Sequence, residues 1–143
     1  ERPSTTKLRQ VYSLAFPNAK IVKTGSITAE MVKYFTNTFL ATKVSFANEM
    51  KQICDGLNID YDKVVEYSTY DERLGKSHWA VPGPDGKLGF GGSCFPKDLN
   101  ALIHLARNLE TSLNTIGGAW DTNLDVRPEE DWKELKGRAV VDE

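Results

Sequence analysis

The chain has 143 residues, of which 40% are hydrophobic, and its 18 basic and 20 acidic residues leave a net charge of −2. This length suits one domain with a core, and the balanced charge argues against a nucleic-acid-binding protein or a disordered tail. No apolar run approaches the ~20 residues of a membrane span, and the start shows no signal-peptide pattern. Because the first residue is Glu1 rather than Met, we expect a processed product or a piece of something longer.

The pattern of apolar residues is mostly helical. Residues 4–16 predict a helix that Pro17 stops, followed by a short extended piece at 20–24. Residues 27–57 contain no proline and one glycine, Gly56, and apolar residues recur there at helical spacing. The stretch predicts a single helix of roughly 45 Å. A helix of this length is usually a central element for packing or a seam between two subunits.

A shorter helix is expected over 58–70, capped near Asp60, with Val64, Val65 and Tyr67 facing inward. Residues 71–93, DERLGKSHWAVPGPDGKLGFGGS, are dominated by turn residues and predict a long loop. A loop of this length usually has a function or is disordered.

Helix is expected to resume with Pro96 in the first helical position. Two more short helices are expected at 111–122 and 128–135, the latter again opening on a proline. Residues 136–143 read as a frayed tail or as the first strand of a further domain. The expected fold class is therefore all-α, one long central helix with shorter helices packed on it. The GFGG run lacks the G-x-G-x-x-G spacing, so no dinucleotide-binding domain is expected within this chain.

The two cysteines, Cys54 and Cys94, differ in their surroundings. A low cysteine count is typical of reducing compartments, so we expect a cytoplasmic protein. Zinc needs about four ligands, and the cysteines and two distant histidines, His78 and His104, show no ligand spacing, so no metal is predicted. Cys54 lies on the apolar stripe of the long helix and is expected in the core.

Cys94 follows a glycine-rich run and precedes a helix, where backbone amides and the helix dipole favour a thiolate. Lys97 adds positive charge, and Gly91 allows the backbone or a ligand to approach closely. Asp98, four residues after Cys94, is expected on the same helical face. A thiol and a carboxylate one turn apart suit a nucleophile and a group that positions water. The alternative is that Cys94 is a small buried residue.

Several other polar residues leave two interpretations open. Lys33 and Asn37 are one turn apart on the long helix, either as a functional pair or as part of a solvated face. Arg73, in DERLG, is by default exposed or paired with Asp71. His78 and its neighbour Trp79 could line a pocket or hold the loop to the core, whereas His104 is expected to be structural.

Three segments resemble one family, the nucleotide-sugar dehydrogenases of the UDP-glucose/GDP-mannose dehydrogenase family. GFGGSCFPKD, residues 89–98, resembles the active-site motif of that family. TAEMVKYFTNTFLATKVSFANEM resembles its long helix, with Lys33 and Asn37 in motif positions, and DERLG resembles its D-x-R-[IL]-G segment. The resemblance covers roughly residues 20–105. It implies that residues 1–143 are a single helical central domain for dimerisation and catalysis, with 136–143 similar to the strand that opens a C-terminal nucleotide-binding domain.

The resemblance also implies a chemistry: UDP-glucose is oxidised at C6 to UDP-glucuronate in two hydride transfers to NAD. Cys94 would form a thiohemiacetal and then a thioester. Lys33 would stabilise oxyanions, Asn37 would hydrogen-bond the same oxygen or a water, and Asp98 would order or activate the hydrolytic water. Substrate-binding residues would be Lys33, Asn37, Arg73, Phe90 and Gly91, with Arg73 reaching across a dimer. Cys94 and Lys97 would face NAD, which is bound mainly by a Rossmann domain absent from this chain.

The partners implied are a UDP-sugar and a second copy joined through the long helix, with no nucleic acid and no membrane. One alternative is a GDP-mannose 6-dehydrogenase, which shares the thiol chemistry. Another is a helical dimerisation module that is inactive when isolated. A thiol-redox protein fits poorly, because no resolving cysteine lies near Cys94.

Overall fold

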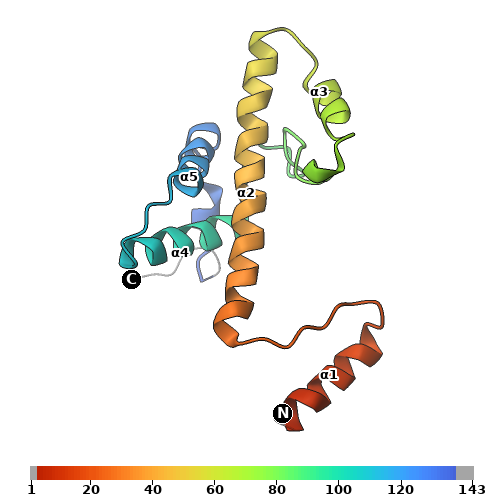
Figure 1. Cartoon of the computed structure of the whole chain (residues 1–143). Helices are drawn as coiled ribbons and strands as arrows, with labels where there is room; N and C mark the ends of the chain where they lie inside the picture. Colours follow the sequence, from red (N-terminus) through yellow and green to blue (C-terminus); the bar gives the residue numbers. More distant parts are fainter. Residues whose placement is uncertain (1–2, 138–143) are drawn as a thin grey trace. The chain divides into compact units, whose positions relative to one another are not determined.

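The computed structural model describes residues 3–137, which form five α-helices and two short 3-10 helices, with no β-strand among the elements of this range (Figure 1). The expectation of an all-α fold is therefore confirmed. No helix in the described range has the length and apolar character needed to cross a membrane. The chain divides into two units, one ending at Met31 and one starting at Val32, and each is described by itself.

The first unit contains helix α1, Pro3–Ala15. Its bounds lie within one residue of the predicted helix, and Pro17 follows as expected. The last turn is closed by the amide of Phe16, which donates to the carbonyl of Tyr12 (2.8 Å). Residues 20–24, predicted to be extended, form no strand.

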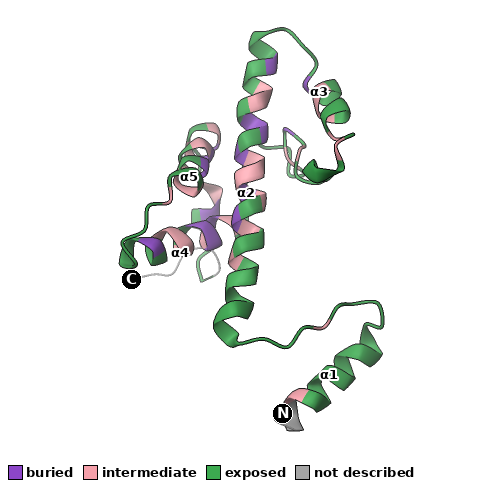
Figure 2. Ribbon diagram, viewed as in Figure 1, coloured by how far each residue is buried: buried purple, intermediate pink, exposed green. Residues whose placement is uncertain are grey.

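Helix α2 spans Ser26–Gly56 and confirms the long helix predicted from the sequence. It ends within one residue of the predicted end: two residues after Gly56, Asn58 takes a left-handed conformation (φ 54°), which asparagine tolerates well. The burial of α2 is unexpected (Figure 2). The buried side chains are small or polar, whereas the large apolar ones are mostly exposed. The buried set is Thr38, Ala41, Ser45, Ala47, Asn48 and Cys54.

Helix α3, Tyr61–Ser68, is capped by Asp60, whose carboxylate accepts from the amides of Asp62 (3.0 Å) and Lys63 (3.4 Å). The predicted cap is therefore confirmed. The predicted inward position of Tyr67 is wrong, since its side chain is 59% exposed. Tyr61 is the buried aromatic instead. The two tyrosines are six positions apart, which puts their side chains about 120° apart around a helix with 3.6 residues per turn, so they do not share a face.

The long loop includes one 3-10 turn, η1 (Glu72–Leu74), and leads into α4, Cys94–Asn108. The predicted start at Pro96 is wrong by two residues. A proline fits anywhere in the first helical turn, because amides there have no partner within the helix. Cys94 is therefore itself the first residue of α4.

Helix α5, Asn114–Val126, begins and ends a few residues later than the predicted 111–122. The predicted helix at 128–135 is wrong, since only the 3-10 segment η2, Asp131–Glu134, forms there. The backbone of Glu130 is left-handed (φ 44°), which interrupts a regular helix. The end of the chain from 138 onward, part of the segment likened to a strand, lies outside the described residues.

Two apolar clusters pack against α2. The first joins Ala47, Cys54, Tyr61 and Val81, so the predicted core position of Cys54, 1% exposed, is confirmed. The second joins Ala41 of α2, Phe90 of the loop and Leu99 of α4. The second cluster therefore brings the glycine-rich loop, residues 88–93, and the start of α4 against the middle of the long helix.

Candidate active site

The carboxylate of Asp98 is fully buried at the contact between α4 and α2. Its Oδ2 accepts a hydrogen bond from Asn37 Nδ2 (2.5 Å) and lies 3.7 Å from Lys33 Nζ. Its Oδ1 is bonded by the ammonium of Lys97. The sequence singled out Lys33 and Asn37 on one helix and Asp98 on another, and the fold brings the carboxylate of Asp98 against both.

The surroundings of Asp98 keep it ionised. Burial alone would raise the pKa of this carboxyl, but hydrogen bonds from Lys97 and Asn37 and the positive charge of Lys33 outweigh burial and hold the pKa below its usual value. The hydrogen bond to Asp98 correspondingly raises the pKa of Lys97. Asp98 is thus a fixed negative charge whose oxygens are already occupied, an arrangement better suited to orienting neighbours than to removing a proton.

The thiol of Cys94 is free and exposed at the first turn of α4. Ser93 Oγ lies 4.0 Å from the sulfur. Although Asp98 follows one turn later, the two side chains differ completely in burial, and the hydrogen bonds of Asp98 go to Asn37 and Lys97. The open position of Cys94 leaves its sulfur accessible to a bound molecule.

A pocket of about 480 Å³ borders the glycine-rich loop. Both loop residues expected to contact a ligand, Phe90 and Gly91, line it, together with His78 and Phe95. The Phe95 ring lies 5.8 Å from the Phe90 ring and 5.9 Å from the His78 ring, measured between centroids. His78 therefore both lines the pocket and packs against the start of α4, so the two alternatives for this residue coexist.

Trp79 holds the loop in place. Its indole nitrogen donates to the carbonyl of Gly75 (2.8 Å), and Lys43 Nζ lies 4.2 Å from the centroid of its ring. The same ammonium donates to the carbonyl of Leu74 (2.8 Å). The loop between η1 and the glycine-rich run is thus anchored to α2.

Arg73 stands apart from this cluster. Its side chain is 89% exposed and forms an ion pair with Asp71, which also caps η1. The default expectation for Arg73, exposed or paired with Asp71, is therefore confirmed within this chain. His104 is also outside the site, with its ring Nε2 3.3 Å from Asn108 Nδ2 one turn along α4.

Sequence reasoning missed three residues that hold the glycine-rich loop: Asn48, Asn123 and Arg127. Arg127, only 2% exposed, bonds Asp131 (2.7 Å) and Asp85 (2.8 Å) through Nη2 and the carbonyl of Leu88 (3.2 Å) through Nη1. Nothing local marks these residues as loop contacts, since their partners in the loop lie 33 to 42 positions away in sequence. The role of Arg127 in holding the loop becomes visible only in the folded chain, where the buried guanidinium bonds two carboxylates.

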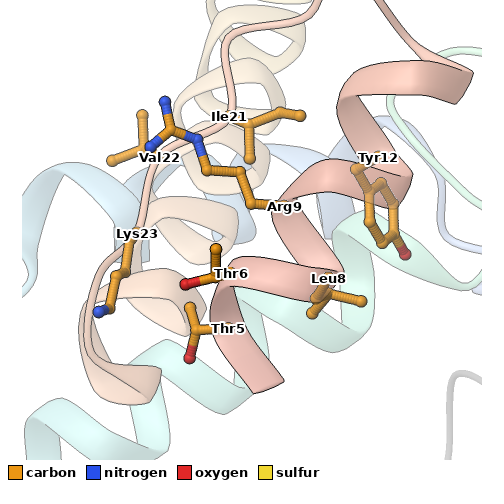
Figure 3. Close-up of a pocket in the computed structure, with 8 residues that line it drawn as sticks. All are labelled: Thr5, Thr6, Leu8, Arg9, Tyr12, Ile21, Val22 and Lys23. Atoms are coloured by element: carbon orange, nitrogen blue, oxygen red, sulfur yellow. The ribbon is translucent and has the colours of Figure 1, made fainter. Parts of the chain in front are cut away.

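A second pocket, of about 210 Å³, lies in the first unit (Figure 3). It is formed by α1 and the segment that follows, and none of the residues predicted for the site contributes to it. The polar groups that α1 contributes to the pocket come from Thr5, Thr6, Arg9 and Tyr12. No cluster of potential metal ligands occurs within residues 3–137.

The fold and the site together define a helical domain with an accessible thiol near a lysine–asparagine–aspartate cluster built on a buried carboxylate. Residues 27–125 match the family model described as "UDP-glucose/GDP-mannose dehydrogenase family, central domain". Since this match covers more than half of the chain, the chain belongs to the UDP-glucose/GDP-mannose dehydrogenase family.

Individual relatives that match this chain are named as UDP-glucose dehydrogenases. The UDP-glucose 6-dehydrogenase TuaD of Bacillus subtilis is 39% identical over 110 residues, which are 77% of this chain and 23% of the relative. AglM of Haloferax volcanii, also a UDP-glucose 6-dehydrogenase, is 39% identical over 125 residues, 87% of this chain and 28% of the relative. The solved structure of a UDP-glucose dehydrogenase from Pyrobaculum islandicum matches with a TM-score of 0.75 and 33% identity, covering 86% of this chain and 27% of the other. The chain thus spans about a quarter of the relatives it matches.

Proposed function

We propose that residues 1–143 act as the central domain of an NAD-dependent UDP-glucose 6-dehydrogenase, which oxidises C6 of UDP-glucose to the carboxylate of UDP-glucuronate. The observation that carries this proposal is the exposed Cys94 on the same helix as Asp98, which binds Lys33 and Asn37. The named activity of the relatives supports the choice of UDP-glucose. A GDP-mannose 6-dehydrogenase is the second candidate, supported only by the breadth of the family description.

Each residue of the site has a part in the proposed reaction. The C6 alcohol would first give a hydride to NAD and lose a proton, leaving an aldehyde. The Cys94 thiol then adds to this aldehyde and forms the carbon–sulfur bond of a thiohemiacetal. The thiohemiacetal would give a second hydride to NAD and lose a proton to become a thioester. Water then adds to the thioester and releases the carboxylate and the thiol. Lys33, with a side chain 60% exposed, supplies positive charge to the oxyanion at C6. Asn37 hydrogen-bonds the same oxygen or the water.

Asp98 has two roles in this proposal. It orders the hydrolytic water, and it fixes the side chains of Lys33 and Asn37 through its Oδ2. Its lowered pKa favours orientation over proton removal, because an ionised carboxylate of low pKa is a weak base. Phe90 and Gly91 line the UDP-sugar site, which the pocket beside the glycine-rich loop supports.

NAD would accept the two hydrides. The glycine-rich loop itself does not suit a pyrophosphate, because the amides of Gly89 and Phe90 already donate to Asn48 and Asn123. We therefore assign the main NAD site to a Rossmann domain outside this chain. Cys94 and Lys97 would face the nicotinamide from this side of the site.

We further propose a homodimer formed through α2. Its large apolar side chains are exposed at spacings of four and seven residues, which places them on one face of the helix. An exposed apolar stripe of this kind marks an interaction surface. Arg73, exposed at the edge of the loop, would then reach the substrate of the partner copy. The stripe consists of Phe35, Phe39, Phe46 and Ile53 of α2 and of Leu57, which follows the last residue of the helix.

The test uses the full-length polypeptide that includes residues 1–143, supplied with NAD and either UDP-glucose or GDP-mannose. We expect UDP-glucuronate and two NADH per sugar with UDP-glucose. The Cys94→Ser variant should stall before the acid is released. Full two-step turnover by Cys94→Ser would refute the nucleophile, and faster oxidation of GDP-mannose would favour the second candidate.

The isolated 143-residue chain tests the dimer separately. We expect a dimer by sedimentation and no NADH formation, as for a dimerisation module that is inactive alone. Phe39→Glu, on the exposed stripe, should give monomers, while the control Lys63→Glu on α3 should not. A wild-type monomer would contradict the dimer, and NADH formation would contradict the inactivity of the isolated chain.

A further inference from the structure

The backbone of the glycine-rich loop is held by side-chain amides from two helices. Asn123 of α5 is fully buried, and both ends of its amide bond the same residue. Its Oδ1 accepts from the Phe90 amide (2.7 Å), and its Nδ2 donates to the Phe90 carbonyl (3.1 Å). A side chain thus satisfies both backbone groups of Phe90, as a neighbouring strand would do in a sheet.

Asn48 of α2 continues this pattern one residue earlier. Its Oδ1 accepts from the Gly89 amide (3.1 Å), while its Nδ2 donates to the carbonyl of Val44 on its own helix (2.9 Å). Two consecutive loop amides are therefore bound by two different helices. This arrangement fixes the loop against both α2 and α5, where hydrogen bonds within the loop alone would fix it against neither.

The fit leaves no room for side chains on the two flanking glycines. A Cβ on Gly89 would lie 2.4 Å from Asn123 Oδ1, and one on Gly91 would lie 2.4 Å from Arg127 Nη2. Gly89 also has a φ of 65°, which disfavours other residues. Glycine at these positions is therefore required by the close approach of Asn123 and Arg127, and α4 begins at Cys94 only three residues after Gly91.

We propose that Asn123 is a positioning residue for Cys94. By binding both backbone groups of Phe90, it fixes the glycine-rich loop, and the loop in turn fixes the position of Cys94 at the start of α4. The inference rests on the proposed role of Cys94 as the nucleophile. Both side-chain hydrogen bonds described for Asn123 go to Phe90, so it would act on the thiol through the loop. Asn48 acts in the same way through Gly89.

The first measurement is independent of catalysis. Amide hydrogen exchange in the 143-residue chain should show the Phe90 amide protected in the wild type. Asn123→Ala and Asn48→Ala should increase exchange of the amides of Phe90 and Gly89, respectively, by roughly tenfold or more, since each loses a buried hydrogen bond. Val64→Ala, in the other apolar cluster, is the control for general destabilisation and should leave both amides protected. An unprotected Phe90 amide in the wild type would overturn the proposal.

The second measurement is the split between kcat and KM in the full-length polypeptide. Misplacing a reacting group by about 1 Å can cost ~100-fold in rate. Asn123→Ala should therefore lower kcat by roughly 10- to 100-fold with little change in KM for UDP-glucose. Asn123→Asp, which keeps the shape and the acceptor but loses the donor, should lie in between. An unchanged kcat in folded variants would show that Asn123 has only a structural role and would overturn the positioning role.

The variants also separate the two proposals. If Asn123→Ala does not fold, Asn123→Asp and Asn48→Ala carry the kinetic test, since each leaves part of the loop's hydrogen bonding in place. If Cys94→Ser keeps full turnover, the proposed nucleophile fails, whatever the exchange results show. If Cys94→Ser stalls but the asparagine variants keep their kcat, the positioning role fails alone.

Discussion

Asn37 and Asp98 are 61 positions apart, yet the amide of one and the carboxylate of the other lie 2.5 Å apart. This hydrogen bond joins the long helix α2 to the helix that begins with Cys94. The carboxylate is fully buried and also accepts a hydrogen bond from Lys97, so it cannot change its orientation without breaking these interactions. The relative placement of Lys33, Asn37 and Cys94 therefore depends on one ionised side chain.

Asp98→Asn should destabilise the chain. The substitution keeps the shape but removes the charge that bonds Lys97 and Asn37 and attracts Lys33. Hydrogen bonds to charged groups contribute about 1.5–3 kcal/mol each, so we expect the free energy of unfolding to fall by roughly 2–3 kcal/mol. Urea denaturation followed by circular dichroism measures this change.

The matched control is Asp55→Asn. Asp55 also pairs with a lysine, Lys51 at 2.5 Å, but its side chain is 59% exposed. Exposed pairs of this spacing contribute about 0.3–0.5 kcal/mol. Equal losses in the two variants would show that burial at Asp98 does not strengthen its interactions.

The two cysteines should differ in their reaction with a thiol reagent. Cys94 is exposed, whereas Cys54 is 1% exposed within the first apolar cluster. We expect one thiol per chain to react rapidly with an aromatic disulfide reagent under native conditions and two in urea. Cys94→Ser should abolish the rapid phase, and Cys54→Ala should leave it intact. Rapid reaction of two thiols in the native chain would contradict the burial of Cys54.

Acid should weaken the attachment of η2 to the glycine-rich loop. The hydrogen bond from Arg127 lowers the pKa of Asp131 to about 2. A carboxyl whose pKa is lowered on folding contributes stability above its unfolded pKa, and this contribution is lost as pH falls toward the folded value. The loss attributable to Asp131 should therefore develop between about pH 4 and pH 2.

Asp131→Asn provides the comparison. The variant should be less stable than the wild type at pH 6 by about 1–2 kcal/mol, less than the full pKa shift implies, because solvent screens a partly exposed carboxylate. The difference should shrink on acidification, since the wild type loses the same charge. Urea midpoints at pH 6, 4 and 3 measure it, and a constant difference over this range would rule out the Arg127–Asp131 linkage.

Two glycine-to-alanine substitutions should have opposite effects. Gly91→Ala would place a Cβ 2.4 Å from the buried Arg127 guanidinium, so we expect a loss of about 1–3 kcal/mol. Gly117, inside α5, has open space where an alanine methyl group would lie, with no neighbouring segment within 4 Å of it. Gly117→Ala should therefore stabilise by about 0.5–1 kcal/mol through helix propensity. Melting temperatures of the two variants give the comparison, and destabilisation by both would contradict the open surroundings of Gly117.

The sequence predicted what depends on local chemistry. The long helix, the Asp60 cap and the core position of Cys54 follow from periodicity and capping, which a few neighbouring residues decide. The start of α4 and the segment at 128–135 were predicted wrongly, because proline fits several first-turn positions and Glu130 takes a left-handed backbone without any local signal.

Part of the candidate site could also be predicted from the sequence. The resemblance pointed to Lys33, Asn37 and Asp98, and the fold brings these three into contact. The residues that support the site could not be predicted from the sequence, because Asn123 and Phe90 are 33 positions apart and only the folded chain brings them together. An asparagine on a helix carries no mark that its amide binds a distant loop.

The binding of the glycine-rich loop by asparagine side chains has a consequence for how this chain tolerates substitution. Loops are commonly the segments that accept change most readily. Here three consecutive loop positions, 89–91, leave little room for other residues: a methyl group on either glycine would meet Asn123 or Arg127, and the ring of Phe90 fills the second apolar cluster. The side of α5 around Gly117 and Gly118 has space to spare. In a saturation library of this chain, we therefore expect fewer tolerated substitutions at loop positions 89–91 than at Gly117 and Gly118 of α5.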